Sequence, residues 1–121
     1  MSLRNHTDLD VWKRAIEFVT SIYKATQEYP KEELYGLVSQ LRRSAISIPS
    51  NIAEGATRQS TKEFIHFLYI ALGSASEVDV QLVISRNLDY LLDKNFIALS
   101  AEREEISRML SGLIKSLRSR K

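Results

Sequence analysis

Apolar residues recur every three or four positions in four stretches of the chain, which is the spacing of one face of an α-helix. The predicted helices cover about residues 8–28, 31–55, 61–92 and 95–118. No stretch alternates apolar and polar residues as a strand does, and no glycine-rich linker divides the chain. Short connections favour antiparallel neighbours. The pattern therefore predicts an all-α fold, a single antiparallel up-down-up-down four-helix bundle over residues 1–121.

A few residues mark where the predicted helices begin and end. Pro30 suits the first turn of the second helix, and Gly55 is a plausible terminator for it. Ser60 and Glu63 have the spacing of a capping box, which predicts the start of the third helix.

The second and third predicted helices carry too few charges to bury only one face. Residues 44–53 and 64–76 contain no formally charged side chain. Apolar residues cover every angle of the third helix, so one core cannot take them all. Because large exposed apolar surfaces usually mark protein contacts, we predict a homo-oligomer built on these two helices. The alternative is a monomer with apolar residues scattered over its surface.

Polar residues form a line along one flank of the second helix. They are Gln40, Arg43, Ser47, Asn51, Glu54 and Arg58. Partly buried charges must be paired or hydrogen-bonded, which predicts a structural network that fixes the register of helices or subunits. The predicted network comprises Arg43, Asn51, Glu54 and, on the third helix, Glu77, a candidate partner for Arg43. A surface for a ligand or nucleic acid is the alternative.

The net charge is only +2, but the basic residues are unevenly distributed. They cluster in residues 34–62 and 108–121, where acidic residues are nearly absent. Two interpretations fit these clusters. In the first, the cations compensate helix dipoles and keep the end of the chain soluble. In the second, they form a phosphate-binding patch. The candidate nucleic-acid-binding residues are Arg42, Arg58, Lys62, Lys115, Arg118, Arg120 and Lys121. Aromatic residues near these cations are scarce in the sequence, so we expect little base stacking and low sequence specificity.

Nothing in the sequence supports an enzyme, a metal site or a cofactor. The absence of cysteine excludes disulfides and thiolate chemistry. Glu63 and His66 have metal-ligand spacing, but a di-iron bundle needs two such motifs and the other histidine, His6, lies outside one. No nucleophile elbow, phosphate loop or dinucleotide fingerprint occurs. Without an apolar signal segment or an apolar run near ~20 residues, we expect a cytoplasmic protein with no membrane span.

Five short motifs in order along nearly the whole chain resemble a known family. They are Leu9-x-Val-Trp12, Glu33-Leu-Tyr-Gly-Leu37, Gln40-Leu-Arg-Arg43-Ser-Ala, Ser47-Ile-Pro-Ser-Asn51-Ile-Ala-Glu54-Gly55, and Ala71-Leu-Gly-Ser74 followed by Glu77. Together they resemble the four-helix bundle proteins encoded by intervening sequences in bacterial 23S ribosomal RNA genes. That broad family also includes accessory proteins of diversity-generating retroelements. The resemblance implies a pentameric ring of antiparallel bundles that binds RNA or DNA, and it assigns no catalytic residue.

Two functional hypotheses follow. The first is a non-enzymatic homo-oligomer that binds ribosomal RNA or DNA with low sequence specificity through basic surface residues. The second is a protein–protein interaction scaffold with no nucleic-acid role. Changing Arg42 and Arg58 to glutamate separates them, because only the first hypothesis depends on these charges.

Overall fold

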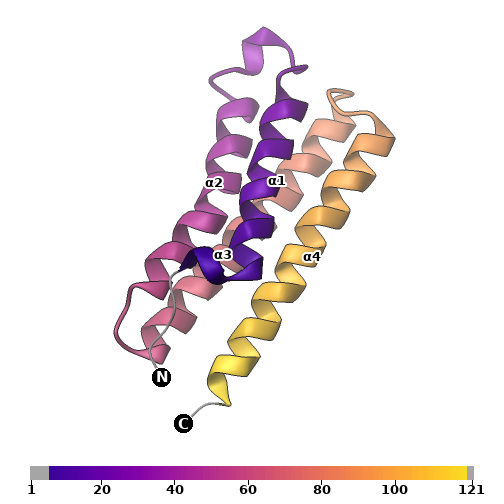
Figure 1. Ribbon diagram of the computed structural model, residues 1–121. Coiled ribbons are helices and arrows are strands. Elements are labelled where there is room, and N and C mark those ends of the chain that lie inside the picture. The colour runs from indigo at the N-terminus through magenta and orange to yellow at the C-terminus, as the bar shows by residue number, and fades with distance from the viewer. Residues whose placement is uncertain (1–5, 120–121) are drawn as a thin grey trace.

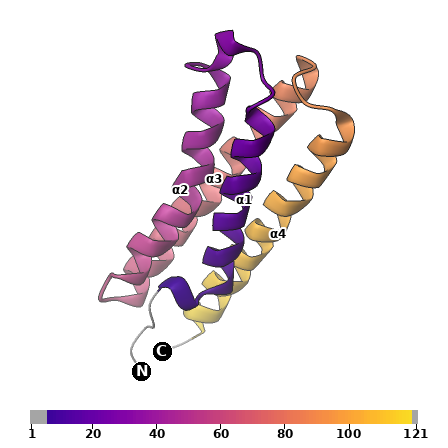
Figure 2. The ribbon, with the colours of Figure 1, turned by 45° about the horizontal axis from the view of Figure 1, so that its top comes forward.

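The computed structural model describes residues 6–119, and over this range it consists of helices without strands (Figure 1). The long helices are α1 (Asp10–Thr26), α2 (Leu37–Ala56), α3 (Thr61–Asn87) and α4 (Asp93–Arg118), with short 3-10 helices η1 (His6–Asp8) and η2 (Lys31–Glu33). The predicted all-α four-helix bundle is confirmed. Successive helices run in opposite directions in both ribbon views (Figures 1 and 2).

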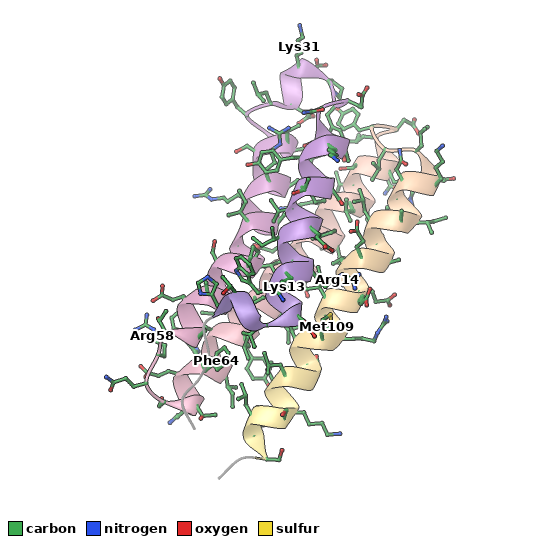
Figure 3. All side chains as sticks on the ribbon, in the orientation of Figure 1. Lys13, Arg14, Lys31, Arg58, Phe64 and Met109 are labelled. Carbon is green, nitrogen blue, oxygen red and sulfur yellow. The ribbon has the colours of Figure 1, made fainter. Side chains whose placement is uncertain are left out.

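The two ends of the bundle differ in what they carry (Figure 1). We call the end with the start of α1, the α2–α3 turn and the end of α4 the basal end. The opposite, apical end carries the α1–α2 and α3–α4 connections. In Figure 3, Arg58 and Lys31 mark the basal and apical ends.

One hydrophobic core runs through the bundle, and every long helix contributes to it at the predicted three- and four-residue spacing. Its largest fully buried apolar side chains are Phe18, Ile22, Leu41, Ile48, Ile52, Phe64, Leu68, Val78, Leu82, Ile106 and Leu110. The α2–α3 pair forms the most extensive helix–helix contact of the bundle.

The helix α2 begins at Leu37, later than the predicted residue 31. After Pro30 the chain forms η2 and a turn, and Gly36 is the N-cap of α2. The Glu33 carboxylate accepts a hydrogen bond from the backbone N–H of Leu37 at 3.1 Å, which satisfies one of the free donors at the helix start. A side chain four residues upstream thus caps α2, a pattern that periodicity alone does not reveal.

The helix α3 ends at Asn87, earlier than the predicted residue 92. Asp89 adopts a left-handed backbone conformation with φ 63°. The N–H of Tyr90 bonds the carbonyl of Ser85, and that of Asp89 bonds the carbonyl of Arg86, both at 2.9 Å. These are the two hydrogen bonds of a Schellman motif, which terminates the helix.

Gly55 does not terminate α2, contrary to the prediction. The helix continues to Ala56, and Thr57 is its C-cap. A Cβ atom at Gly55 would lie 2.8 Å from Cβ of Phe67 and 2.9 Å from Cδ1 of Phe64. Glycine is required here because α3 approaches the α2 backbone closely.

The start of α3 is as predicted. The Ser60 hydroxyl oxygen accepts a hydrogen bond from the N–H of Glu63 at 3.1 Å, and the hydroxyl group lies 3.2 Å from the Glu63 carboxylate. The cap fixes the short turn between α2 and α3, which places the residues of that turn at the basal end.

Judged by length and composition alone, α3 could cross a membrane, although no membrane span was expected from the sequence. One such helix is weak support for a span, because the core helix of a soluble protein meets the same criterion. Here its inner face supplies Phe64, Leu68 and Val78 to the bundle core. The cytoplasmic location stays a prediction.

Candidate functional site: a basic end, a groove and an apolar helix face

Four of the predicted nucleic-acid-binding residues lie at the basal end of the bundle. Arg58 is in the α2–α3 turn and Lys62 is in the first turn of α3, whereas Lys115 and Arg118 are in the last turn of α4. The antiparallel arrangement brings these distant segments to one end. Arg120 and Lys121 lie outside the described residues.

Arg58 is held by its neighbours at this end. Its Nη2 atom donates to Glu54 Oε2 at 2.6 Å, and its guanidinium carbon lies 4.7 Å from the centroid of the Phe67 ring. The pair links two members of the predicted polar line across one helical turn. Because Glu54 neutralises much of this charge, Arg58 contributes less to an anion surface than its position suggests.

The remaining described cations at the basal end are more accessible. Lys62 and Lys115 are exposed, and neither makes an ion pair within residues 6–119. The Arg118 guanidinium carbon lies 5.4 Å from the centroid of the Tyr69 ring, which is 44% exposed. The expectation that aromatic residues are scarce near the cations was wrong. The rings of Phe67 and Tyr69 belong to α3, whereas Arg58 lies in the preceding turn and Arg118 lies on α4.

Arg42 lies at the other end of α2 and does not join this surface. Arg42 lies 14 residues before Ala56, the last residue of α2, which corresponds to about 21 Å of helix at 1.5 Å per residue. Nε of Arg42 donates to Thr26 Oγ1 at 2.9 Å, and Nη2 donates to the Tyr23 carbonyl at 3.4 Å. The guanidinium also lies over the Tyr23 ring at 4.3 Å. Arg42 thus fastens α2 to the last turn of α1.

Asn51, a residue of the predicted polar network, belongs to a hydrogen-bonded group of side chains between α2 and α3. Nδ2 of Asn51 donates to Ser47 Oγ at 2.9 Å, and the hydroxyl oxygens of Ser47 and Ser74 lie 2.7 Å apart. Arg43 and Glu77 are exposed, and neither has a hydrogen bond or ion pair within the described part of the chain. Their membership of the network stays a prediction.

A groove between α1 and α2, near the apical end, was not predicted from the sequence. Its volume is about 470 Å³, and it is lined by Tyr23, Leu34, Tyr35, Val38, Ser39, Arg42, Arg43 and Ile46. Tyr35 is 93% exposed. We call this feature the α1–α2 groove. It combines apolar walls with two arginines and contains no acidic residue.

A strip on α3 that is apolar except for one glutamate faces solvent. It consists of Ile70, Gly73, Glu77, Val80 and Ile84, and we call it the outer face of α3. The side chain of Val80 is 57% exposed and that of Ile84 is 42% exposed. These residues follow one another at helical spacing, so they form a continuous surface rather than isolated exposed positions.

A second depression, of about 550 Å³, lies between α1 and α4 near the apical end. Its polar wall includes Ser21 and Glu102, whose hydroxyl and carboxylate oxygens are 3.4 Å apart. Burial raises the pKa of Glu102, while the Ser21 hydrogen bond and the charge of Arg14 oppose the shift. Arg14 itself forms a two-pronged ion pair with Glu105, and this pair lowers the pKa of Glu105.

Acidic and histidine residues do not converge on a metal site in residues 6–119. His66 lies edge-on to the Phe67 ring at a centroid distance of 5.5 Å, while Glu63 caps α3. Both residues of the Glu63–His66 motif therefore have structural contacts of their own.

The arrangement of helices and motifs matches a defined family. The sequence model of the 23S rRNA-intervening sequence protein family covers residues 7–112. The chain belongs to this family.

A solved structure supports the fold of this family member. It is a protein of unknown function from the S23 ribosomal protein family of Bacteroides thetaiotaomicron. It superposes with a TM-score of 0.80 at 27% sequence identity, over 87% of this chain and 95% of that chain. No curated protein matches the chain. The family relationship thus establishes the fold and carries no assigned activity.

Proposed function

We propose that the protein is a non-enzymatic homo-oligomer that binds nucleic acid through its basal end. The observation that carries the proposal is the convergence of Lys62, Lys115 and Arg118 from the two ends of the α3–α4 hairpin. Residues 108–119 contain no acidic side chain, so the last turns of α4 carry positive charge only. The family name, which refers to 23S ribosomal RNA genes, favours ribosomal RNA as the first probe.

One chain offers too few cations for tight binding by itself. An assembly repeats the basal end once per subunit, and each neutralised phosphate steepens the dependence of log affinity on log salt by about 0.7–0.9. The exposed Tyr69 ring beside Arg118 provides one stacking surface for a base. With one such ring per chain, we expect weak discrimination among sequences.

The test is binding of labelled 23S ribosomal RNA and duplex DNA fragments at two salt concentrations, by filter retention or fluorescence anisotropy. A Lys62→Glu, Lys115→Glu double variant should lose most of the affinity and flatten the salt dependence. Lys31→Glu is the matched control, because Lys31 is an exposed cation at the apical end (Figure 3). Absence of binding at low salt, or equal loss in both variants, contradicts the nucleic-acid role.

Self-assembly is tested separately by light scattering behind a sizing column. The apolar outer face of α3 supports assembly, because such a strip is unusual on a monomer. We expect a mass several times the 13.9 kDa of one chain, and the family resemblance suggests five subunits. A mass of one chain at micromolar concentration would refute the assembly.

A protein–protein interaction scaffold is the second candidate function. The α1–α2 groove favours it, since apolar walls with an exposed tyrosine and arginines are typical of protein contacts. If this role is the biological one, the basal variant keeps full function in cells while a groove variant such as Tyr35→Ala loses it.

A further inference from the structure

We propose that the outer face of α3 in one chain packs into the α1–α2 groove of the next chain, with Glu77 of the first opposite Arg43 of the second. The inference rests on the self-assembly in the proposed function and names the surfaces that carry it. It concerns this chain's own residues, and it can fail while self-assembly itself holds.

One surface protrudes and the other is hollow. The outer face of α3 is a convex helix surface from which Ile70, Val80 and Ile84 project. A Cβ atom at Gly73 would meet nothing within 4 Å in its own chain, so the middle of this surface is open to a neighbouring backbone. The α1–α2 groove is a hollow of about 470 Å³ with apolar walls that include Leu34 and Ile46. Both of these side chains are exposed in the single chain.

The two surfaces are complementary in charge. Between residues 64 and 85 the formally charged side chains are Glu77 and Asp79. Nε of Arg103 lies 3.6 Å from Asp79 Oδ1, so Asp79 has a partner on α4 and Glu77 is left as the unpaired charge of the outer face.

The groove supplies the opposite charge. It contains two arginines and no carboxylate. Arg42 is occupied by Thr26 and Tyr23, as described above. Arg43 is exposed and has no partner among the described residues. An Arg43–Glu77 pair between chains would satisfy both charges, and exclusion of water by the surrounding apolar residues would strengthen their attraction.

The two surfaces share no residue, which determines the type of assembly. The groove is lined by α1, α2 and the connection between them, whereas the outer face belongs to α3, which does not line the groove. A contact between unlike surfaces leaves one free surface on each chain of a pair, so the assembly continues beyond two chains. A symmetric contact between two outer faces of α3 would instead bring two Glu77 carboxylates together, which like-charge repulsion disfavours.

The decisive experiment uses two variants that each inactivate one surface. Ile46→Glu places a charge in the groove, and Ile84→Glu places a charge on the outer face of α3. Both positions are about two-fifths exposed in the single chain, so neither change disturbs the core. Each variant alone should be monomeric by light scattering and retain the helical circular dichroism of the wild type. Their mixture should form one-to-one pairs and nothing larger, because only one functional surface remains on each chain.

The charge pair has its own test. Arg43→Glu and Glu77→Arg should each weaken assembly about tenfold or more, and the double variant should recover most of the loss. Lys94→Glu is the control for a change of net charge, because Lys94 is an exposed cation on α4 away from both surfaces.

The outcomes separate this inference from the proposed function. An oligomeric wild type with an equally oligomeric Ile46→Glu variant overturns the groove contact and leaves self-assembly intact. A double charge variant no better than the single ones overturns the Arg43–Glu77 pair. A monomeric wild type overturns self-assembly and the contact together.

Discussion

The hydroxyl oxygens of Ser47 and Ser74 lie 2.7 Å apart across the contact between α2 and α3. Ser74 lies within hydrogen-bond distance of the Ile70 carbonyl, at 3.2 Å, and the Asn51 amide donates to Ser47. Since each hydroxyl has one proton, the arrangement is satisfied when every group donates in the same direction, from Asn51 through Ser47 and Ser74 to Ile70. A directional chain of this kind specifies how α2 and α3 align.

Removing one hydroxyl from this chain should destabilise the fold. Ser74→Ala leaves Ser47 without its acceptor, and we expect the free energy of unfolding to fall by about 1 kcal/mol. The double variant with Ser47→Ala should cost less than the sum of the single changes, because the two side chains act through one bond. Urea denaturation measures all three. Ser50→Ala, on an exposed position of α2, is the control; an equal loss there would contradict the role of the chain.

Gly55 lies where α2 packs closely on α3, so a larger residue there has no room. Gly55→Ala gains up to about 1 kcal/mol of helix propensity, but its Cβ would meet Phe67 Cβ at 2.8 Å and the Phe64 carbonyl oxygen at 3.2 Å. Neither atom is the end of a flexible side chain, so the helices must separate. We expect a net loss of about 1–3 kcal/mol in the free energy of unfolding.

Gly112→Ala is the matched control for this prediction. Gly112 is an exposed residue inside α4, and a Cβ there meets nothing within 4 Å. The variant should be more stable than the wild type by up to about 1 kcal/mol. Thermal unfolding of both variants therefore gives shifts of opposite sign. Two stabilising shifts would show that helix propensity, and not close packing, decides at Gly55.

The sequence predicted the elements whose signal is local. Helical periodicity identified all four helices, and the pair Ser60 and Glu63 identified the start of α3. Periodicity could not identify the start of α2, because Leu34 and Leu37 have the spacing of a helix although the residues between them form a turn. Nor could it identify the end of α3, because Asp89 carries no sequence signal for a left-handed backbone.

The candidate site depends on contacts between segments that are far apart in the chain, and this limits what the sequence can predict. Arg42 and Tyr23 are separated by 19 residues, so their stacking follows from the packing of α1 on α2. The sequence did identify Arg43 as a charge in need of a partner and Glu77 as a candidate for it. It left open whether the network joins helices of one chain or subunits, and the structure leaves both residues without a partner in their own chain.

Asp89 occupies a conformation that favours glycine, so Asp89→Gly should stabilise the protein. With φ 63° at the residue that follows the last turn of α3, any Cβ is unfavourable, although aspartate tolerates the position better than most residues. We expect a gain of about 0.5–1 kcal/mol in the free energy of unfolding. Asn87→Gly, two residues earlier and inside the helix, should lose stability instead. If both changes destabilise, the Schellman motif does not limit α3 in solution.

Glu102 lies in the depression between α1 and α4. Burial raises the pKa of its carboxyl, so the folded protein binds the proton more tightly than the unfolded chain does. This group therefore stabilises the fold most when it is protonated, and its contribution falls as the pH rises from the ordinary glutamate range through the raised pKa. Glu102→Gln should remove this fall, so it should gain on the wild type over the pH range that starts at the ordinary glutamate pKa and runs up through the raised one. Denaturant titrations across that range measure the difference.

Ser21→Ala should affect the pH dependence of stability in the opposite direction to Glu102→Gln. The Ser21 hydroxyl lies 3.4 Å from the Glu102 carboxylate and favours its ionised form. Without that hydrogen bond the pKa of Glu102 rises further, so the pH-dependent loss of stability extends to higher pH. In the Glu102→Gln background the Ser21→Ala change should no longer alter the pH dependence, because no carboxyl remains to titrate at residue 102. A pH effect of Ser21→Ala that persists in this double variant would assign the titration to another group.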